Sequence, residues 1–347
     1  MSTTTTTTTL PAHIRILPEL DDAWRVTPAG ARLDAVRAGA LLLKARLHGG
    51  PTVKRVRTCD LITLPYPTRY GLCDAATSLL PFLLITNRMQ VVTLRCDEGE
   101  KILLVNPSDH ERDAETPYFK RLAERLPQFL DRLVVKRHST VPARLAETGV
   151  LGEDVDYITY DHLHTQDLRR VMLEWCPRAK LLVNREELAI FSRLHPLQRD
   201  WFIADALAGI PAERLVALDH DVMVGEGVAL VRTPGHTIGN HSIVLHTDNG
   251  VWTISENGIS ADNYSPERSA IGGIAASARN AGVDVILNAN TREHSLDQYT
   301  SMILEKTLAD VCGDGSGYVQ CFPSSELTGS AMMPGLAPTY GFGKIEA

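Results

Sequence analysis

Hydrophobic and polar positions along the first part of the chain follow two different periods. From residue 29 to residue 47, apolar residues recur at near-helical spacing without a proline, which predicts an amphipathic helix ahead of the main domain. After Gly50 and Pro51, short β-rich runs predict strands at residues 58–64, 83–94 and 101–105. A further helix is expected over residues 117–137, with an interruption near Pro127.

Helix and strand signals then alternate through the second part of the chain. Helices are expected at residues 141–147, 168–175 and 186–194, and strands at residues 155–160, 180–183, 228–232, 242–246, 251–255 and 283–287. Two runs of strands, separated by helices and without a linker, predict a layered α/β sandwich. The chain becomes rich in glycine and proline after Lys306, which predicts an extended C-terminal arm.

Length and composition agree with one large soluble domain. The chain has 347 residues, and 44% of them are hydrophobic, which is enough to bury a sizeable core. We expect residues 1–50 to form a disordered threonine-rich tail and the first helix, residues 51–311 to form the main domain, and residues 312–347 to form the arm. The threonine run has neither a basic segment nor an apolar one, so no signal peptide or membrane span is expected.

The net charge and the cysteine pattern limit the kinds of binding partner and the cellular compartment to be expected. The net charge is −7, so the chain lacks the basic surface that binding to nucleic acid requires. The six cysteines are scattered without a C-x-x-C pair, which is typical of reduced thiols in a cytoplasmic protein. The expected partner is therefore a small-molecule substrate, with a homo- or hetero-oligomer as a possible assembly.

Candidate metal ligands follow the predicted strand at residues 155–160. His162 and His164 alternate along an extended segment, so both imidazoles point to the same face and can bind one ion. The pair alone is equally compatible with two ordinary polar loop residues. The polar cluster lies at the carboxyl end of a strand, where α/β folds place their chemistry.

A third histidine lies in the segment Thr-Pro-Gly-His-Thr-Ile-Gly at residues 233–239. Proline and glycine shape a tight turn directly after the predicted strand at 228–232, and this turn presents His236. The alternative is a generic turn that contains a histidine. Together with His162 and His164, His236 supplies the three neutral imidazoles of an open tetrahedral zinc site with water at the fourth position.

These two segments resemble the metal motifs of the metallo-β-lactamase superfamily. Residues 155–167 resemble its H-x-H-x-D-H signature, residues 233–239 resemble its third-ligand motif, and the likeness extends from about residue 60 to residue 309. The resemblance implies a four-layer αββα sandwich for the main domain. It also implies one or two divalent metal ions, with zinc, iron and manganese as the candidates.

The resemblance is weaker at the second metal position of that family. Gln166 stands where the family has an aspartate, and Asp167 stands where it has a histidine. Glu256 takes the place of the metal-bridging aspartate, and Asn290 the place of the last histidine, for which His294 is a possible substitute. A second ion, if bound, would therefore meet an oxygen-rich site that suits a harder metal such as Mn²⁺ or Fe²⁺.

Two further residues are candidates for supporting roles. Asp161 precedes the first histidine, and His241 follows the third; each is expected to orient a ligand from behind, as metal sites commonly require. For His241, a histidine at a strand start that bonds to the backbone is an equal alternative. Asp167 and Glu256 are the candidate catalytic groups, which would orient the attacking water or take its proton.

Three functions are compatible with this pattern. The first is a hydrolase that uses a metal-bound hydroxide on a small-molecule ester, lactone or similar electrophile, aromatic ones included. The second is an oxygen-dependent enzyme of the same fold with one iron ion. The third is a catalytically degenerate subunit of a hetero-oligomeric complex, in which the N-terminal helix and the C-terminal arm would serve assembly.

Overall fold

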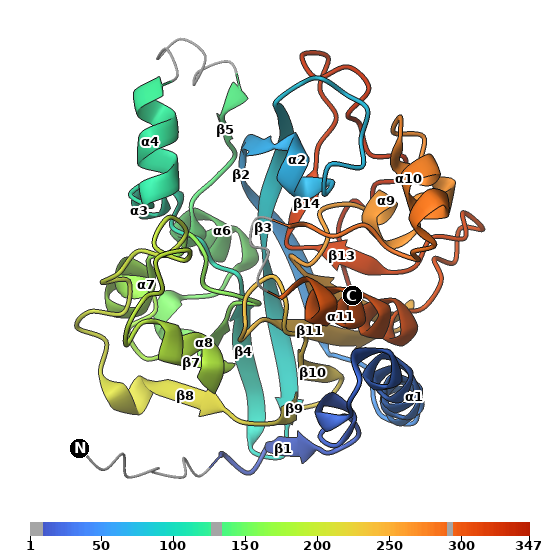
Figure 1. Ribbon diagram of the computed structural model, residues 1–347. Helices are drawn as coiled ribbons and strands as arrows, with labels where there is room; N and C mark the ends of the chain where they lie inside the picture. Colours follow the sequence, from blue (N-terminus) through green and yellow to red (C-terminus); the bar gives the residue numbers. More distant parts are fainter. Residues whose placement is uncertain (1–9, 126–133, 290–293) are drawn as a thin grey trace.

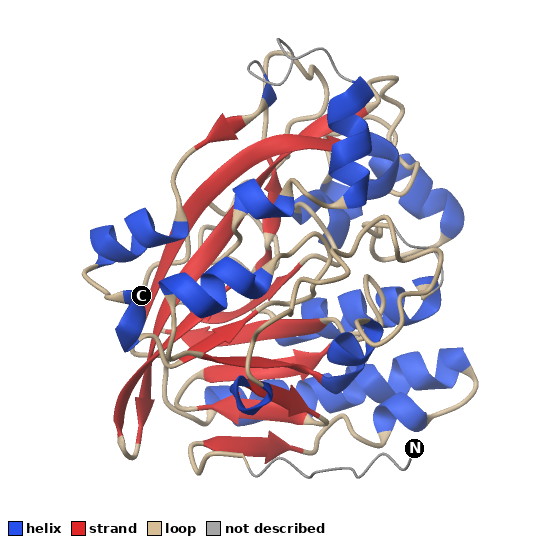
Figure 2. Cartoon of the chain, turned by 90° about the vertical axis from the view of Figure 1, so that its left-hand side faces the viewer, coloured by secondary structure: helices blue, strands red, loops and turns tan. Residues whose placement is uncertain are grey.

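Two β-sheets pack face to face and helices cover both outer faces, which gives four layers in the order αββα (Figures 1 and 2). The computed structural model describes residues 10–125, 134–289 and 294–347. The threonine-rich tail up to residue 9, the predicted helix interruption at Pro127, and Asn290 lie outside the described residues. The fold predicted from the sequence is confirmed.

The larger sheet has eight strands and combines a long antiparallel hairpin with parallel strands. β2 and β3 form an antiparallel hairpin, β3 also pairs antiparallel with β4, and β4, β6, β7 and β8 run parallel. The strands, in spatial order, are β5 (Lys136–Arg137), β2 (Arg55–Pro67), β3 (Phe82–Cys96), β4 (Gly99–Val105), β6 (Tyr157–Thr159), β7 (Lys180–Asn184) and β8 (Leu215–Leu218), with β14 (Ser325–Leu327) paired to β3.

The smaller sheet has six strands and is antiparallel except at one edge, where β12 and β13 are parallel. Its strands, in spatial order, are β1 (Ile14–Leu17), β9 (Asp221–Val224), β10 (Val228–Arg232), β11 (His241–Thr247), β12 (Gly250–Ser255) and β13 (Cys321–Pro323).

The main core lies between the two sheets because alternate residues of each strand point inward. Val92 and Leu103 of the larger sheet belong to the same buried cluster as Leu230 and Ile243 of the smaller one. Their neighbours in the sequence, such as Val91, point to the outer faces and pack against helices instead. This two-residue period is the one that the sequence pattern predicts for strands.

Helices cover the outer faces of both sheets (Figure 1). The smaller sheet packs against α1 (Ala29–His48) and α11 (Ser295–Leu308). The larger sheet packs against α6 (Val141–Thr148), α7 (Leu168–Arg170), a π-helical turn at Val171–Trp175, and α8 (Arg185–Ile190). The remaining α-helices are α2 (Thr68–Gly71), α3 (His110–Asp113), α4 (Pro117–Arg125), α9 (Ala261–Tyr264) and α10 (Ile274–Ala281). Short 3-10 helices lie at Ala23–Arg25, Gly152–Asp154, Ala212–Arg214 and Pro266–Arg268.

Two predicted elements are corrected by the structure. Residues 283–287 form no strand; Val285 and Ile286 are buried against neighbouring helices, and the place beside β12 is taken by β13. A short apolar run signals burial but does not reveal whether a sheet partner is present. The helix expected as far as residue 137 is also wrong at its end, because β5 pairs with β2 at Ile62 and Thr63.

The C-terminal residues join both sheets. β13 extends the smaller sheet and β14 extends the larger one, so the chain crosses between them at Ser324. The last residue, Ala347, then exchanges two backbone hydrogen bonds with Val56 on β2, at 3.0 and 3.2 Å. This crossing brings the arm to the edge of the sandwich where the histidines lie. Among the described residues, no helix is long and apolar enough to span a membrane.

Candidate metal centre

The three predicted histidines meet at one end of the sandwich. One ring nitrogen of each of His162, His164 and His236 lies within 4.8 Å of the other two. Their ring centroids are separated by 4.6 to 5.3 Å. His162 and His164 follow β6 of the larger sheet and His236 follows β10 of the smaller one, so the cluster joins the two sheets. Within the described residues it is the one group of this kind that could hold a metal ion.

Two glycines explain why the loop that carries His236 can reach this place. A Cβ atom added to Gly235 would lie 2.2 Å from Cα of Gln298 on α11. A Cβ atom added to Gly239 would lie 2.2 Å from the backbone nitrogen of Glu187 on α8. The loop therefore sits between backbone segments of two helices, at a distance that only glycine permits.

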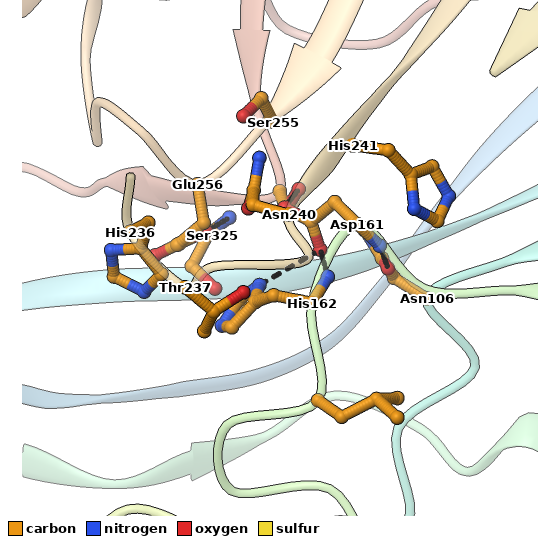
Figure 3. A network of polar contacts seen from close by, with 12 residues as sticks. Asn106, Asp161, His162, His236, Thr237, Asn240, His241, Ser255, Glu256 and Ser325 are labelled. Atoms are coloured by element: carbon orange, nitrogen blue, oxygen red, sulfur yellow. Dashed lines mark hydrogen bonds and ion pairs between the residues drawn. The ribbon is translucent and has the colours of Figure 1, made fainter. Parts of the chain in front are cut away.

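Oxygen acceptors behind the rings fix the orientation of two of the histidines. Nδ1 of His162 donates to Oδ1 of Asp161 at 3.1 Å, and Nδ1 of His236 donates to the backbone oxygen of Asn288 at 3.3 Å. A carboxylate and a carbonyl can only accept, so Nδ1 carries the proton and Nε2 is the expected ligand atom of both rings. Figure 3 shows Asp161 and His162 in contact.

Asp161 is itself held by hydrogen bonds from several sides. Its second carboxylate oxygen accepts a hydrogen bond from Ser324 Oγ at 2.8 Å. Its backbone N–H donates to Asn106 Oδ1 at 3.1 Å, and its backbone oxygen accepts from the N–H of His241 at 2.9 Å. The imidazole of His241 lies behind the cluster, 2.9 Å from Thr159 Oγ1.

Burial keeps two of the three rings neutral. It lowers the pKa of His164 well below its ordinary value and that of His236 to about 3, and the neighbouring histidines act in the same direction. Burial also lowers the pKa of His162, but the carboxylate of Asp161 outweighs it and raises this pKa above its ordinary value. Neutral imidazoles are the form that binds a metal ion.

Glu256 lines the same cavity as the three histidines, and Figure 3 shows it near His236. It follows β12 and is 6% exposed, and its Oε2 accepts a hydrogen bond from the backbone N–H of Ser325 at 2.7 Å. Burial, together with the charge of Asp161, raises the pKa of Glu256 to about 8. A carboxyl group with such a raised pKa can exchange a proton in the range around neutral pH.

Asp167, which the sequence suggests as a metal ligand or catalytic group, does not belong to the cluster of three histidines. Its carboxylate accepts hydrogen bonds from Nε of Arg169 at 2.9 and 3.2 Å and also caps the N-terminus of α7. Arg112 lies 3.8 Å from the same carboxylate. Gln166 does line the cavity. His294 lies at the start of α11 and is not part of the histidine cluster.

The cavity in front of the histidines has a volume of about 620 Å³, and its lining is mostly apolar with several polar groups. The polar lining includes the histidines, Asp161, Gln166 and Glu256, and also Asn87, His110, Asp113 and Arg137. The apolar lining includes Leu64, Ile85, Phe119, Leu122, Val135 and Trp201. Trp201 also stacks on Tyr118 with ring centroids 4.4 Å apart, which stiffens this wall.

Several residues around the centre were not found by reasoning from the sequence. Ser324 and Ser325 belong to the glycine- and proline-rich arm. Asn257 is part of no recognised motif, but its side-chain oxygen accepts a hydrogen bond from the N–H of His236 at 3.3 Å. Glu187 lies in the run Arg-Glu-Glu-Leu, which reads as an ordinary helix start. Each contacts the centre across a long separation in sequence, which no local pattern signals.

Comparisons with known proteins give structural likeness at low sequence identity. No protein-family model matches the chain. A probable metal-dependent hydrolase from Staphylococcus aureus is similar at 11% identity and a TM-score of 0.49, over 73% of this chain and 84% of that one. A dizinc quorum-quenching lactonase is similar at 13% identity and a TM-score of 0.48, over 86% and 95%. A quorum-quenching N-acyl homoserine lactone lactonase is similar at 17% identity and a TM-score of 0.45, over 67% and 87%.

The four-layer fold follows from the strand pairing and the buried core of this chain itself, without the compared structures. Two sheets share one core, helices cover both outer faces, and the histidines of both motifs meet where the sheets join. The chain thus has the four-layer αββα fold that its resemblance to the metallo-β-lactamase superfamily implied.

Proposed function

We propose that the chain is a metal-dependent hydrolase of small ester, lactone or similar substrates that are neutral or moderately apolar. The observation that carries the proposal is the cluster of His162, His164 and His236, which lines the same largely apolar cavity as Glu256. A concave apolar site with a few convergent polar groups is typical of small-molecule binding.

The residues at the cluster fit one metal ion. His162, His164 and His236 would hold it, since their ring nitrogens lie close together and two of the rings have their protonated nitrogen turned to an acceptor. Three histidines with an open fourth position form a common catalytic metal site. An ion bound there supplies Lewis acidity, which polarises the substrate carbonyl and lowers the pKa of water.

Among the described residues of the second position, Asp167 and Gln166 do not fit a second ion. Asp167 is held by Arg169 and Arg112, and Gln166 offers only a neutral amide. An ion at this place would have to displace an arginine from a buried carboxylate, which is 1% exposed. We therefore propose a centre with a single metal ion.

The other side chains of the cavity have separate tasks in the proposed reaction. Glu256 takes the proton of the attacking water through its carboxylate, which the N–H of Ser325 holds in place. The walls around Phe119 and Trp201 bind the apolar part of the substrate and exclude bulk water from the reacting groups.

Replacing Glu256 by glutamine tests the proposal. The variant keeps the size of the side chain but loses the proton acceptor, so kcat for ester or lactone hydrolysis is expected to fall by about 100-fold or more. The measurement is steady-state hydrolysis of a panel of aryl esters and lactones, before and after the metal is removed with a chelator. Glu267→Gln, at an exposed site away from the cavity, serves as the control.

The hydrolase proposal requires that activity of the native protein disappears with the chelator and returns when metal is added back. Hydrolysis that persists at full rate without metal would contradict it. Oxygen consumption by an iron-loaded protein that hydrolyses none of the panel would favour the oxygen-dependent alternative instead.

A further inference from the structure

We infer that Glu187 is a positioning residue that fastens the two ligand-bearing loops to each other and so sets the affinity of the centre for its metal. The inference rests on the proposed metal site formed by His162, His164 and His236. Glu187 lies on α8 and does not face the cavity, so it contacts neither substrate nor metal.

One carboxylate oxygen of Glu187 holds the first loop. Oε1 accepts a hydrogen bond from the backbone N–H of Leu163 at 2.7 Å. Leu163 is the residue between His162 and His164, so this bond fixes the segment that turns both rings to the same side.

The other carboxylate oxygen holds the second loop. Oε2 accepts from the hydroxyl of Thr237 at 2.6 Å and from the backbone N–H of Gly239 at 3.2 Å. Thr237 directly follows His236, so this bond fixes the third ligand. The absence of a side chain at Gly239 lets the loop lie against the backbone of Glu187.

The environment of Glu187 makes these bonds strong. The residue is fully buried, with 0% exposure, and its two oxygens receive three donors from two loops that follow strands of different sheets. Hydrogen bonds to a buried carboxylate are stronger than those between neutral groups, and an acceptor that is lost leaves buried N–H groups without a partner. The spacing between the two sets of ligands therefore depends on one side chain.

Substitutions at Glu187 separate this role from simple packing. In Glu187→Gln the volume is kept, but the amide NH₂ must face one of the two loops, so that loop loses its acceptor. Glu187→Ala removes both acceptors. Thr237→Val removes only the 2.6 Å bond and keeps the carboxylate, which provides a milder variant should the alanine variant fail to fold. Glu186→Gln is the matched control, since Glu186 is exposed and its carboxylate pairs with Arg232 instead of with Leu163, Thr237 or Gly239.

The test is the affinity of metal-free full-length protein for Co²⁺, followed through the visible absorption of the bound ion. We expect Glu187→Gln and Thr237→Val to weaken Co²⁺ binding by about 10-fold and Glu187→Ala by about 100-fold, because partners of metal-binding residues have effects of this size. The band shape should also change with the altered ligand geometry. Glu186→Gln should bind Co²⁺ as the native protein does.

Thermal unfolding of the metal-free variants provides the second readout. A purely structural role would lower the unfolding temperature and leave the Co²⁺ affinity of the folded protein unchanged, which would overturn the inference. Native protein that binds no Co²⁺ would instead overturn the metal site itself, and the inference with it. Weaker binding in Glu187→Gln and Thr237→Val, with the control unaffected, supports the positioning role.

Discussion

Replacing His236 by alanine is expected to abolish metal binding and to lower the rate of hydrolysis by about 1000-fold or more. Two histidines remain in this variant, both from the first loop, and they cannot complete an open tetrahedral site. The Lewis acidity of a bound metal is worth several kcal/mol at the transition state, which corresponds to a loss of this size. The measurement is kcat/KM for the best substrate, together with the metal content of the purified variant.

The control for His236→Ala is His220→Ala. His220 is half-exposed and contacts Asp21, and it does not line the cavity. This variant should keep the metal and the activity. A folded His236→Ala protein with native activity would rule out the proposed centre, whatever its metal content.

Replacing Gly239 by alanine is expected to destabilise the protein by about 3 kcal/mol or more. The new methyl group would lie 2.2 Å from the backbone nitrogen of Glu187 and 2.5 Å from its Cβ atom, so one of two backbone segments must move. Forcing extra volume into a packed interior usually costs about 1 to 3 kcal/mol, and a contact with backbone is at the upper end. The measurement is the free energy of unfolding in urea for the metal-free protein.

Gly30→Ala is the matched control for this substitution. Gly30 lies in the first turn of α1, and a Cβ atom there would meet nothing within 4 Å. Alanine at this site should leave stability unchanged or raise it by up to about 1 kcal/mol, because alanine favours helix. Equal stability of Gly239→Ala and native protein would show that the loop is not packed against α8 as described.

Eight of the fourteen described strands, and the three histidines, could be predicted because each has a local signal. The pattern predicts no strand at β1, β5, β8, β9, β13 or β14. The two-residue alternation marks the inner faces of the strands, and the motifs around His162 and His236 follow directly on strands that the pattern identifies. Both strands end at the same end of the sandwich, which brings together histidines that are more than 70 residues apart in sequence.

The supporting residues could not be predicted because their partners are set by tertiary packing. Glu187 looks like any acidic residue at a helix start, and Ser324 looks like part of a loose arm. The error at residues 283–287 has the same origin: an apolar run can be buried by helices as well as by a sheet, and the edge beside β12 goes to a segment near the end of the chain.

The surroundings of Asp167 give a physical reason for one departure from the family motif. From the sequence it was a candidate ligand, since it stands where the related family has a histidine. In the structure its carboxylate is bound by Arg169, a residue only two positions away. A cation from the chain itself thus compensates the charge of Asp167.

The number of metal ions per chain tests the central claim most directly. We would measure it by elemental analysis of native protein purified without chelator, beside His162→Ala and His236→Ala variants prepared in the same way. The account predicts about one ion per native chain and less than about a tenth of that in each variant. Native protein with no bound ion, or variants that retain the full metal content, would contradict it.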